Sequence, residues 1–239
     1  TISAQGQPSE EDPYGTQLHA AAWEDIFTAF PEVDGGIMDG WTESAYELIY
    51  HHGNAVFREL DDHQRQQATA RGYDSAKLDR GRAHLYQRFQ NFSPAEVDYY
   101  GDHGLLSEMN LFDINEDALY WLRWRREDGI REGQAFRQVL DEMPRKILLG
   151  NGPRSAVFSG MTALDFHAWD QIVDLLLVKH YFWHRGFDGL YGTVARWVKQ
   201  IQAWNPALDE AQCWKVVRAW LGINLPEIEC LSDMELGFP

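Results

Sequence analysis

The chain has 239 residues, of which 44% are hydrophobic, so it can bury one substantial core and we expect a single domain. Its formal net charge of −16 argues against nucleic acid or an anionic membrane as a partner. No stretch predicts a transmembrane helix or a signal peptide, and two cysteines are too few for a disulfide framework, which favours a reducing, cytoplasmic setting.

The negative charge is concentrated at the two ends of the chain. Residues 1–40 carry eight acidic groups and residues 224–239 carry four, and neither stretch contains Lys or Arg. We interpret residues 1–13 as a flexible acidic arm, 14–223 as a helical domain and 224–239 as an extended acidic tail. The acidic ends could bind a basic protein partner, fold back onto the chain's own basic region, or serve solubility alone. A bridge between Cys213 and Cys230 is also left open.

Apolar spacing and capping residues predict helices along almost the whole chain. The clearest start is Ser93-Pro94-Ala95-Glu96, where serine caps, proline occupies the first turn and glutamate follows. No run of residues predicts a strand, and Asp34-Gly35-Gly36 and Gly150-Asn151-Gly152 are interpreted as turns. We therefore expect an all-α, single-domain bundle of about eight helices. The expected ranges are 16–30, 42–71, 75–92, a short helix from 94, 115–126, 134–149, 162–184, 190–204 and 206–221.

Residues 162–184 are interpreted as the buried central helix of this bundle, because the stretch is apolar on nearly every side. A membrane is excluded by Asp170, Asp174, one lysine and three histidines within this stretch. At 100° per residue, His167, Asp170 and Asp174 fall on one narrow ridge of this helix. The ridge either faces solvent or pairs with arginines of neighbouring helices, or it faces a cavity that holds a metal ion or a reactive ligand.

If the ridge faces a cavity, seven residues have predicted roles. On the ridge, His167, Asp170 and Asp174 are the candidate catalytic groups that would move protons. A cation would be held by His180 and His184, whose spacing of four residues lets two imidazoles reach one ion, and by Asp188 as a further ligand or as a partner of His184. His52, which the predicted second helix turns inward, is the candidate cofactor-binding residue.

These residues predict a metal- or haem-dependent oxidoreductase that acts on a small aromatic or apolar molecule. Imidazole and carboxylate suit iron, which we favour, and also manganese or zinc. The ten Trp, ten Tyr and twelve Phe would line the substrate pocket. Two alternatives stay open: a non-catalytic acidic binding protein (an accessory subunit, a chaperone or an immunity-like protein) and a metal-free hydrolase or lyase that uses Asp170 and His167. A homo-oligomer is also allowed.

Overall fold

The computed structural model of the chain describes residues 15–39, 48, 54–153, 156–161, 165–178, 190–225 and 228–234, and for 15–17 and 39 the backbone alone. Of these residues, 62% are helical and 6% are in strands, so the prediction of a mostly helical fold is confirmed. The helices are α1 (Gly15–Ala29), α2 (Asp62–Ala70), α3 (Ser75–Phe89), α4 (Pro94–Tyr100), α5 (Leu105–Leu111), α6 (Glu116–Asp141), α7 (Phe166–Asp170), α8 (Leu190–Trp204) and α9 (Glu210–Leu221). The strands are β1 (Gly35–Asp39), β2 (Leu148–Gly152) and β3 (Leu175–Leu176).

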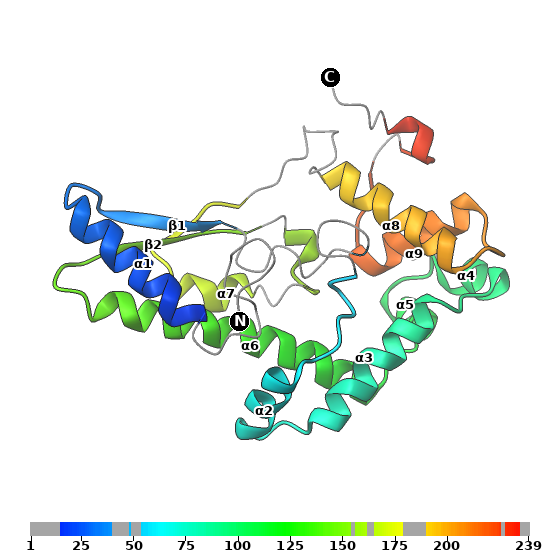
Figure 1. Ribbon diagram of the computed structural model, residues 1–239. Helices are drawn as coiled ribbons and strands as arrows, with labels where there is room; N and C mark the ends of the chain where they lie inside the picture. Colours follow the sequence, from blue (N-terminus) through cyan, green and yellow to red (C-terminus); the bar gives the residue numbers. More distant parts are fainter. Residues whose placement is uncertain are drawn as a thin grey trace.

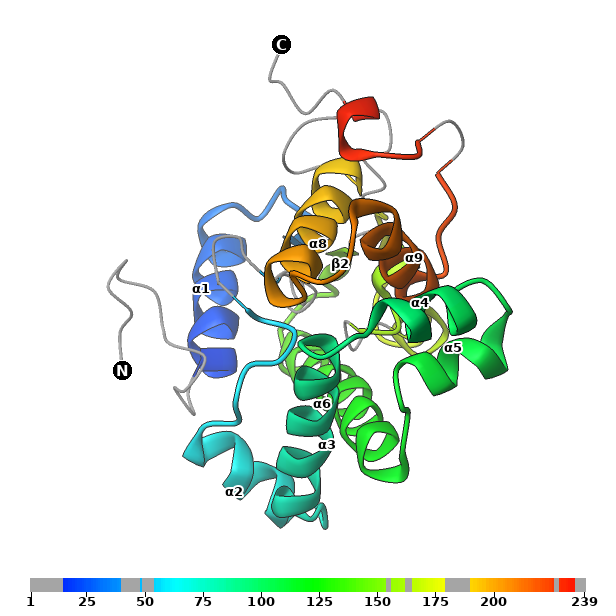
Figure 2. The same cartoon turned by 90° about the vertical axis from the view of Figure 1, so that its right-hand side faces the viewer.

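Helix α6 connects two groups of elements. It has 26 residues and is therefore about 39 Å long. Figure 1 shows α1 and the strands at the carboxyl end of α6, and α3 at its amino end. Helices α8 and α9 pack against each other, and Figure 2 shows α9 beside α4. Trp121 and Trp124 of α6 belong to the larger core, whereas Phe136 and Leu140 belong to a smaller core beneath the strands. One helix thus supplies side chains to both cores.

The larger core is rich in aromatic side chains. Phe89 of α3 stacks on Phe112, with 5.4 Å between ring centres, and meets Trp220 of α9 edge-on at 4.8 Å. Asn205, which follows α8 and is only 4% exposed, connects α8 to the end of α3 within this core. Its Oδ1 accepts the N–H of Phe92 at 2.8 Å, and its Nδ2 donates to the carbonyls of Phe89 and Ile201 at 2.8 and 2.9 Å.

The strands form a three-stranded parallel sheet in the order β1-β2-β3. Helices α2 to α6 lie between β1 and β2 along the chain, and α7 lies between β2 and β3. One face packs on α1 and α6 through Leu149, Ile147 and their neighbours. The opposite face carries side chains that are 44 to 53% exposed: Ile37, Leu148, Leu175 and Leu177. Parallel sheets normally have both faces covered, so the described residues leave an apolar row of this sheet in contact with solvent.

The prediction of a buried central helix over residues 162–184 is wrong. Within the described part of this stretch, α7 ends after Asp170, and Leu175–Leu176 pairs with Gly150 and Asn151 as strand β3. An apolar run looks the same in a buried strand as in a buried helix. The chain leaves the helix because the backbone of Asp174 bonds to β2: its N–H donates to the carbonyl of Leu149 at 2.8 Å.

Other boundaries also differ from the predictions. The expected ranges 115–126 and 134–149 are replaced by one helix, α6, which runs through the gap between them and ends at Asp141. Gly133, which lies in that gap, leaves room for the ring of Trp169. Residues 54–61 are not helical, and α2 begins only after Asp61, whose side chain caps it together with Gln64. The supposed turns at Gly35–Gly36 and Gly150–Gly152 belong to β1 and β2.

The described helices include none whose length and hydropathy together would carry it across a lipid bilayer. Both cysteines are free thiols: Cys213 is buried in the larger core and Cys230 is partly exposed.

Candidate functional site

The carboxyl ends of the three strands meet at one edge of the sheet, because all three strands run in the same direction. Asp39 pairs with Gly152 at the ends of β1 and β2, and Asn151 pairs with Leu176 at the end of β3. In open parallel sheets, ligands bind outside the carboxyl ends of the strands, where the connections leave space between them. This edge is therefore the first place to search for a site.

Asn151 is the polar side chain that stands out at this edge. It is 1% exposed and lies in register between Met38 of β1 and Leu176 of β3. Its backbone carbonyl accepts the N–H of Leu177 at 2.9 Å. In the described part of the protein, neither Oδ1 nor Nδ2 of its amide has a hydrogen-bond partner. A buried polar group that makes no hydrogen bond lowers the stability of the fold by about 1–3 kcal/mol. Packing alone therefore does not explain why an asparagine is buried at this position.

Asp174, a predicted catalytic residue, has a structural role at the other end of β3. Its Oδ2 accepts the N–H of Leu149 at 2.9 Å and lies 3.1 Å from Nη1 of Arg137. Its Oδ1 lies 3.6 Å from Nζ of Lys146. The N–H of Leu149 is the main reason that the pKa of this carboxyl is lowered, and the two cations add to the effect. The alternative in which the ridge pairs with an arginine is therefore confirmed for Asp174.

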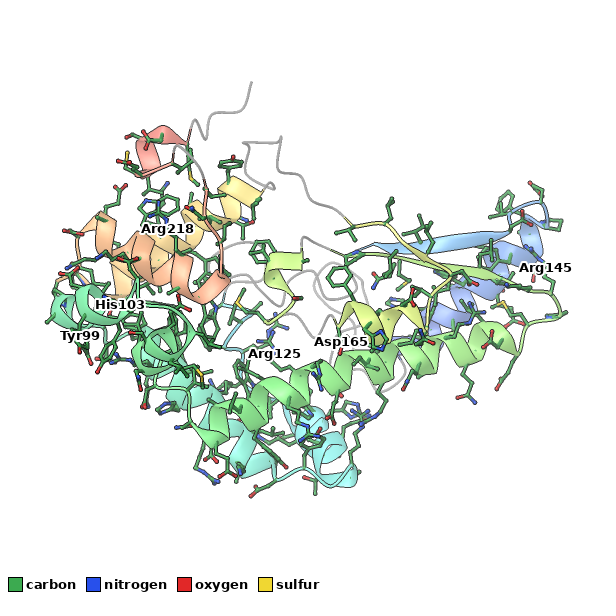
Figure 3. All side chains as sticks on the ribbon, turned by 180° about the vertical axis from the view of Figure 1, so that it is seen from behind. Tyr99, His103, Arg125, Arg145, Asp165 and Arg218 are labelled. Atoms are coloured by element: carbon green, nitrogen blue, oxygen red, sulfur yellow. The ribbon has the colours of Figure 1, made fainter. Side chains whose placement is uncertain are left out.

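The two other predicted catalytic residues lie on α7. His167 and Asp170 are both exposed, and Asp170 accepts a hydrogen bond from Gln171 at 3.1 Å. The helix is started by Asp165, whose side chain accepts the N–H groups of His167 and Ala168, and Figure 3 shows Asp165 beside α6. Because the helix ends at Asp170, the structure does not join these two residues and Asp174 into one helical ridge.

The remaining predicted residues, His52, His180, His184 and Asp188, lie outside the described residues. In the sequence, His180 and His184 follow the end of β3 by four and eight residues. Within the described ranges, no group of three or more His, Cys, Asp or Glu side chains is arranged to hold a metal ion. The metal and cofactor roles of these four residues stay predictions from the sequence.

Sequence reasoning did not single out Asn151, because it placed this residue in a turn. A usable signal was present: the apolar run Ile147-Leu148-Leu149 followed by Gly-Asn-Gly-Pro. A short apolar run bounded by glycine and proline is typical of a buried strand. The polar residue at the end of such a strand is then the expected site residue.

Comparison of the chain with protein-family models, with curated proteins and with solved structures finds no match.

Proposed function

We propose that this protein binds a small polar molecule at the carboxyl edge of its parallel sheet, and that the amide of Asn151 recognises the molecule. The observation that supports this proposal is the burial, at the end of β2, of an amide that has no hydrogen-bond partner among the described residues. A second support is the direction of the strands, since ligands of open parallel sheets bind outside the carboxyl ends of the strands.

The chemistry of the amide defines the ligand. A carboxamide offers an acceptor and two donor hydrogens side by side, so it pairs with a group that also carries a donor beside an acceptor, such as a primary amide or neighbouring hydroxyls. The hydrogen bonds are stronger at a site that excludes water. The expected substrate thus carries a polar group, in contrast to the apolar molecule predicted from the sequence. For the reaction we retain the proposal of a metal- or haem-dependent oxidation, which rests on the sequence alone.

Thermal unfolding in the presence of simple ligands tests the binding proposal. Acetamide, glycerol and glucose carry the required groups. A molecule that binds the folded state stabilises it by RT ln(1 + [L]/Kd), so the melting temperature rises with the logarithm of its concentration above Kd. We expect at least one of them to stabilise the wild type and to have less effect on Asn151→Leu. The control is Asn110→Leu, which removes an exposed asparagine of α5 and should keep the wild-type shift. Equal shifts in the wild type and Asn151→Leu would contradict the proposal.

A further inference from the structure

The most exposed large hydrophobic side chains of the described residues lie together at the turn between α4 and α5. Tyr99 is 70% exposed, Leu105 71% and Leu106 78%, whereas the other exposed side chains of this kind range from 37 to 53%. His103 links them, because its ring centre lies 6.2 Å from that of Tyr99 and Leu105 is two residues further along the chain. Figure 3 shows Tyr99 and His103 at one end of the molecule and Arg145 at the other. We call Tyr99, Leu105 and Leu106 the turn patch.

The backbone holds both leucines of the turn patch in defined positions. They open α5 directly after Gly104, whose φ of 86° favours glycine. The N–H groups of Ser107 and Glu108 donate to the carbonyl of Gly104 at 2.9 and 3.0 Å, which closes the first turn of the helix. Single exposed leucines are common on protein surfaces, whereas a group of them marks an interaction site. A partner that covers these side chains has little backbone to order.

The chain around the turn patch is acidic. Residues 89–122 carry seven Asp or Glu side chains and no Lys or Arg. Cations of α3 pair with three of these carboxylates: Arg88 with Glu96 at 3.3 Å, Lys77 with Glu116, and Arg80 with Asp117 at 2.9 Å. The other four carboxylates belong to Asp98, Asp102, Glu108 and Asp113.

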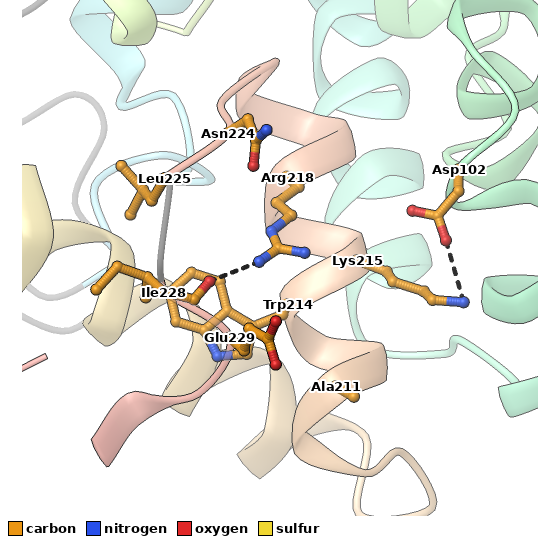
Figure 4. A pocket seen from close by; sticks show the side chains of 9 residues that line it. All are labelled: Asp102, Ala211, Trp214, Lys215, Arg218, Asn224, Leu225, Ile228 and Glu229. Atoms are coloured by element: carbon orange, nitrogen blue, oxygen red, sulfur yellow. Dashed lines mark hydrogen bonds and ion pairs between the residues drawn. The ribbon is translucent and has the colours of Figure 1, made fainter. Parts of the chain in front are cut away.

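One ammonium group is shared by two of these four carboxylates. Nζ of Lys215 lies 3.3 Å from Asp98 and 3.1 Å from Asp102, and Figure 4 shows it reaching Asp102. Four carboxylates with one ammonium leave a formal charge of −3 around the turn when the imidazoles are neutral. Glu108 is three residues after Leu105 on α5, so these two side chains are neighbours on the helix surface. Uncompensated negative charge thus borders the exposed leucines.

We propose that the turn patch binds a basic, amphipathic segment of a partner protein. Apolar side chains of that segment would cover Tyr99, Leu105 and Leu106, and its Lys or Arg side chains would face the surrounding carboxylates. A second copy of the chain would bring the same negative charge to the contact, and nucleic acid or an anionic membrane is repelled in the same way. The charge around the patch therefore selects a cationic partner. This role is separate from ligand binding at the sheet edge.

Fluorescence anisotropy with three dye-labelled helical peptides tests this proposal on the full chain. The first peptide carries leucines along one face and lysines along the other. The second has glutamates in place of the lysines, and the third has serines in place of the leucines. We expect the first to bind at least about tenfold more tightly than either of the others, because it alone matches both the apolar patch and its charge. Equal affinity for the first and third peptides, or no binding of the first, would overturn the proposal.

Matched apolar variants assign the binding to the turn patch. The double variant Leu105→Ser, Leu106→Ser should bind the first peptide at least about tenfold more weakly than the wild type. The control is Leu18→Ser, Ile26→Ser, which removes two exposed apolar side chains from α1, at the opposite end of the molecule in Figure 1. It should bind like the wild type. Equal losses in both double variants, or in neither, would rule out this surface.

A second pair of variants separates local charge from net charge. Asp98→Asn, Glu108→Gln and the control Asp25→Asn, Glu24→Gln each remove two negative charges, the latter from exposed positions of α1. At low salt, we expect the first pair to weaken binding of the first peptide by about three- to tenfold and the control to weaken it by less than about twofold. The same loss in both would show that net charge alone attracts the peptide, which contradicts the proposal.

Hydrogen exchange of the wild type keeps the test independent of how the variants fold. Saturating amounts of the first peptide should slow the exchange of backbone N–H groups in residues 99–111 and leave α1 unchanged. Unchanged exchange in residues 99–111 would refute the proposal.

The two other occupants of an exposed apolar patch are measured with the same variants. We expect the wild type neither to associate with itself through the turn patch nor to bind phosphatidylcholine vesicles more tightly than the first peptide. Self-association that Leu105→Ser, Leu106→Ser abolishes would assign the patch to a second copy of the chain. Tighter binding of the vesicles would assign it to a lipid surface, and either result would overturn the proposal.

Discussion

Asp174 connects three segments of the chain through one carboxylate. It bonds to the start of β2, to Arg137 of α6 and to Lys146 in the segment between them. We expect Asp174→Asn to lower the free energy of unfolding by about 1–2 kcal/mol at neutral pH, since the amide keeps the bond from Leu149 but loses both ion pairs. Urea unfolding measures this. Asp170→Asn, an exposed position on α7, is the control and should change stability by less than about 0.5 kcal/mol.

The pH dependence of this contribution follows from the lowered pKa of Asp174. The folded chain releases the proton more readily than the unfolded chain, so the contribution is complete above the ordinary pKa of 3.8 and is lost as the pH falls below it. The difference between the wild type and Asp174→Asn should therefore be largest at pH 7 and should shrink as the pH falls below 3.8. A difference that persists unchanged at pH 3 would contradict this assignment.

Burial determines the reactivity of Cys213. It raises the pKa of this thiol from 9.0 to about 11, so at pH 8 about one thiol in a thousand is ionised. Iodoacetamide should label the partly exposed Cys230 and leave Cys213 unlabelled, as mass spectrometry of the digested protein would show. Because the folded state holds the proton more tightly, the contribution of this neutral thiol to stability is complete below pH 9 and is lost as the pH rises toward 11. Equal labelling of both cysteines would contradict the burial of Cys213.

At the scale of elements, glycines permit two close approaches of α6. A Cβ on Gly133 would lie 2.6 Å from the ring of Trp169, and a Cβ on Gly81 of α3 would collide with the backbone carbonyl of Asp117. We expect Gly133→Ala to cost about 1–3 kcal/mol despite the better helix propensity of alanine. Gly81→Ala should cost more, since a backbone carbonyl yields less than a ring. Gly160→Ala meets no atom within 4 Å and is the neutral control. Chemical unfolding of the three variants would contradict this account if all behaved alike.

Helices with local signals were predictable, and strands were not. The capping box at Ser93, the start of α6 after Asn115 and the bounds of α8 all appear as the sequence predicts. These features depend on residues a few positions apart. A parallel strand exists only by pairing with a distant one: Ile37 pairs with Gly150, and Gly150 pairs with Leu175. The candidate site at the sheet edge depends on these pairings, so local periodicity could not reveal it.

At the scale of the whole molecule, the sequence predicts that the chain binds a metal ion, and this is tested on the full chain. Elemental analysis after reconstitution with Fe(II) should find about one ion per chain, as expected for a site built from His180, His184 and Asp188. The double variant His180→Ala, His184→Ala should bind less, whereas His84→Ala, in which a partly buried imidazole near Asp113 is removed, should not differ from the wild type. A chain that takes up neither metal nor haem would contradict this prediction.

Two buried asparagines allow the most direct test of the proposed ligand site. Asn205 and Asn151 are 4% and 1% exposed, but the amide of Asn205 makes three hydrogen bonds and that of Asn151 makes none within the described residues. Leucine has the same number of side-chain heavy atoms with the same branching, and no polar group. The two substitutions therefore differ mainly in what happens to hydrogen bonding.

The measurement is the free energy of unfolding of Asn151→Leu and Asn205→Leu without ligand. We predict that Asn205→Leu loses about 2–4 kcal/mol, because its backbone partners are left unsatisfied. Asn151→Leu should be as stable as the wild type or more stable by about 1 kcal/mol, because an amide kept for a ligand contributes nothing to the free fold. A loss at Asn151 comparable to that at Asn205 would contradict the account.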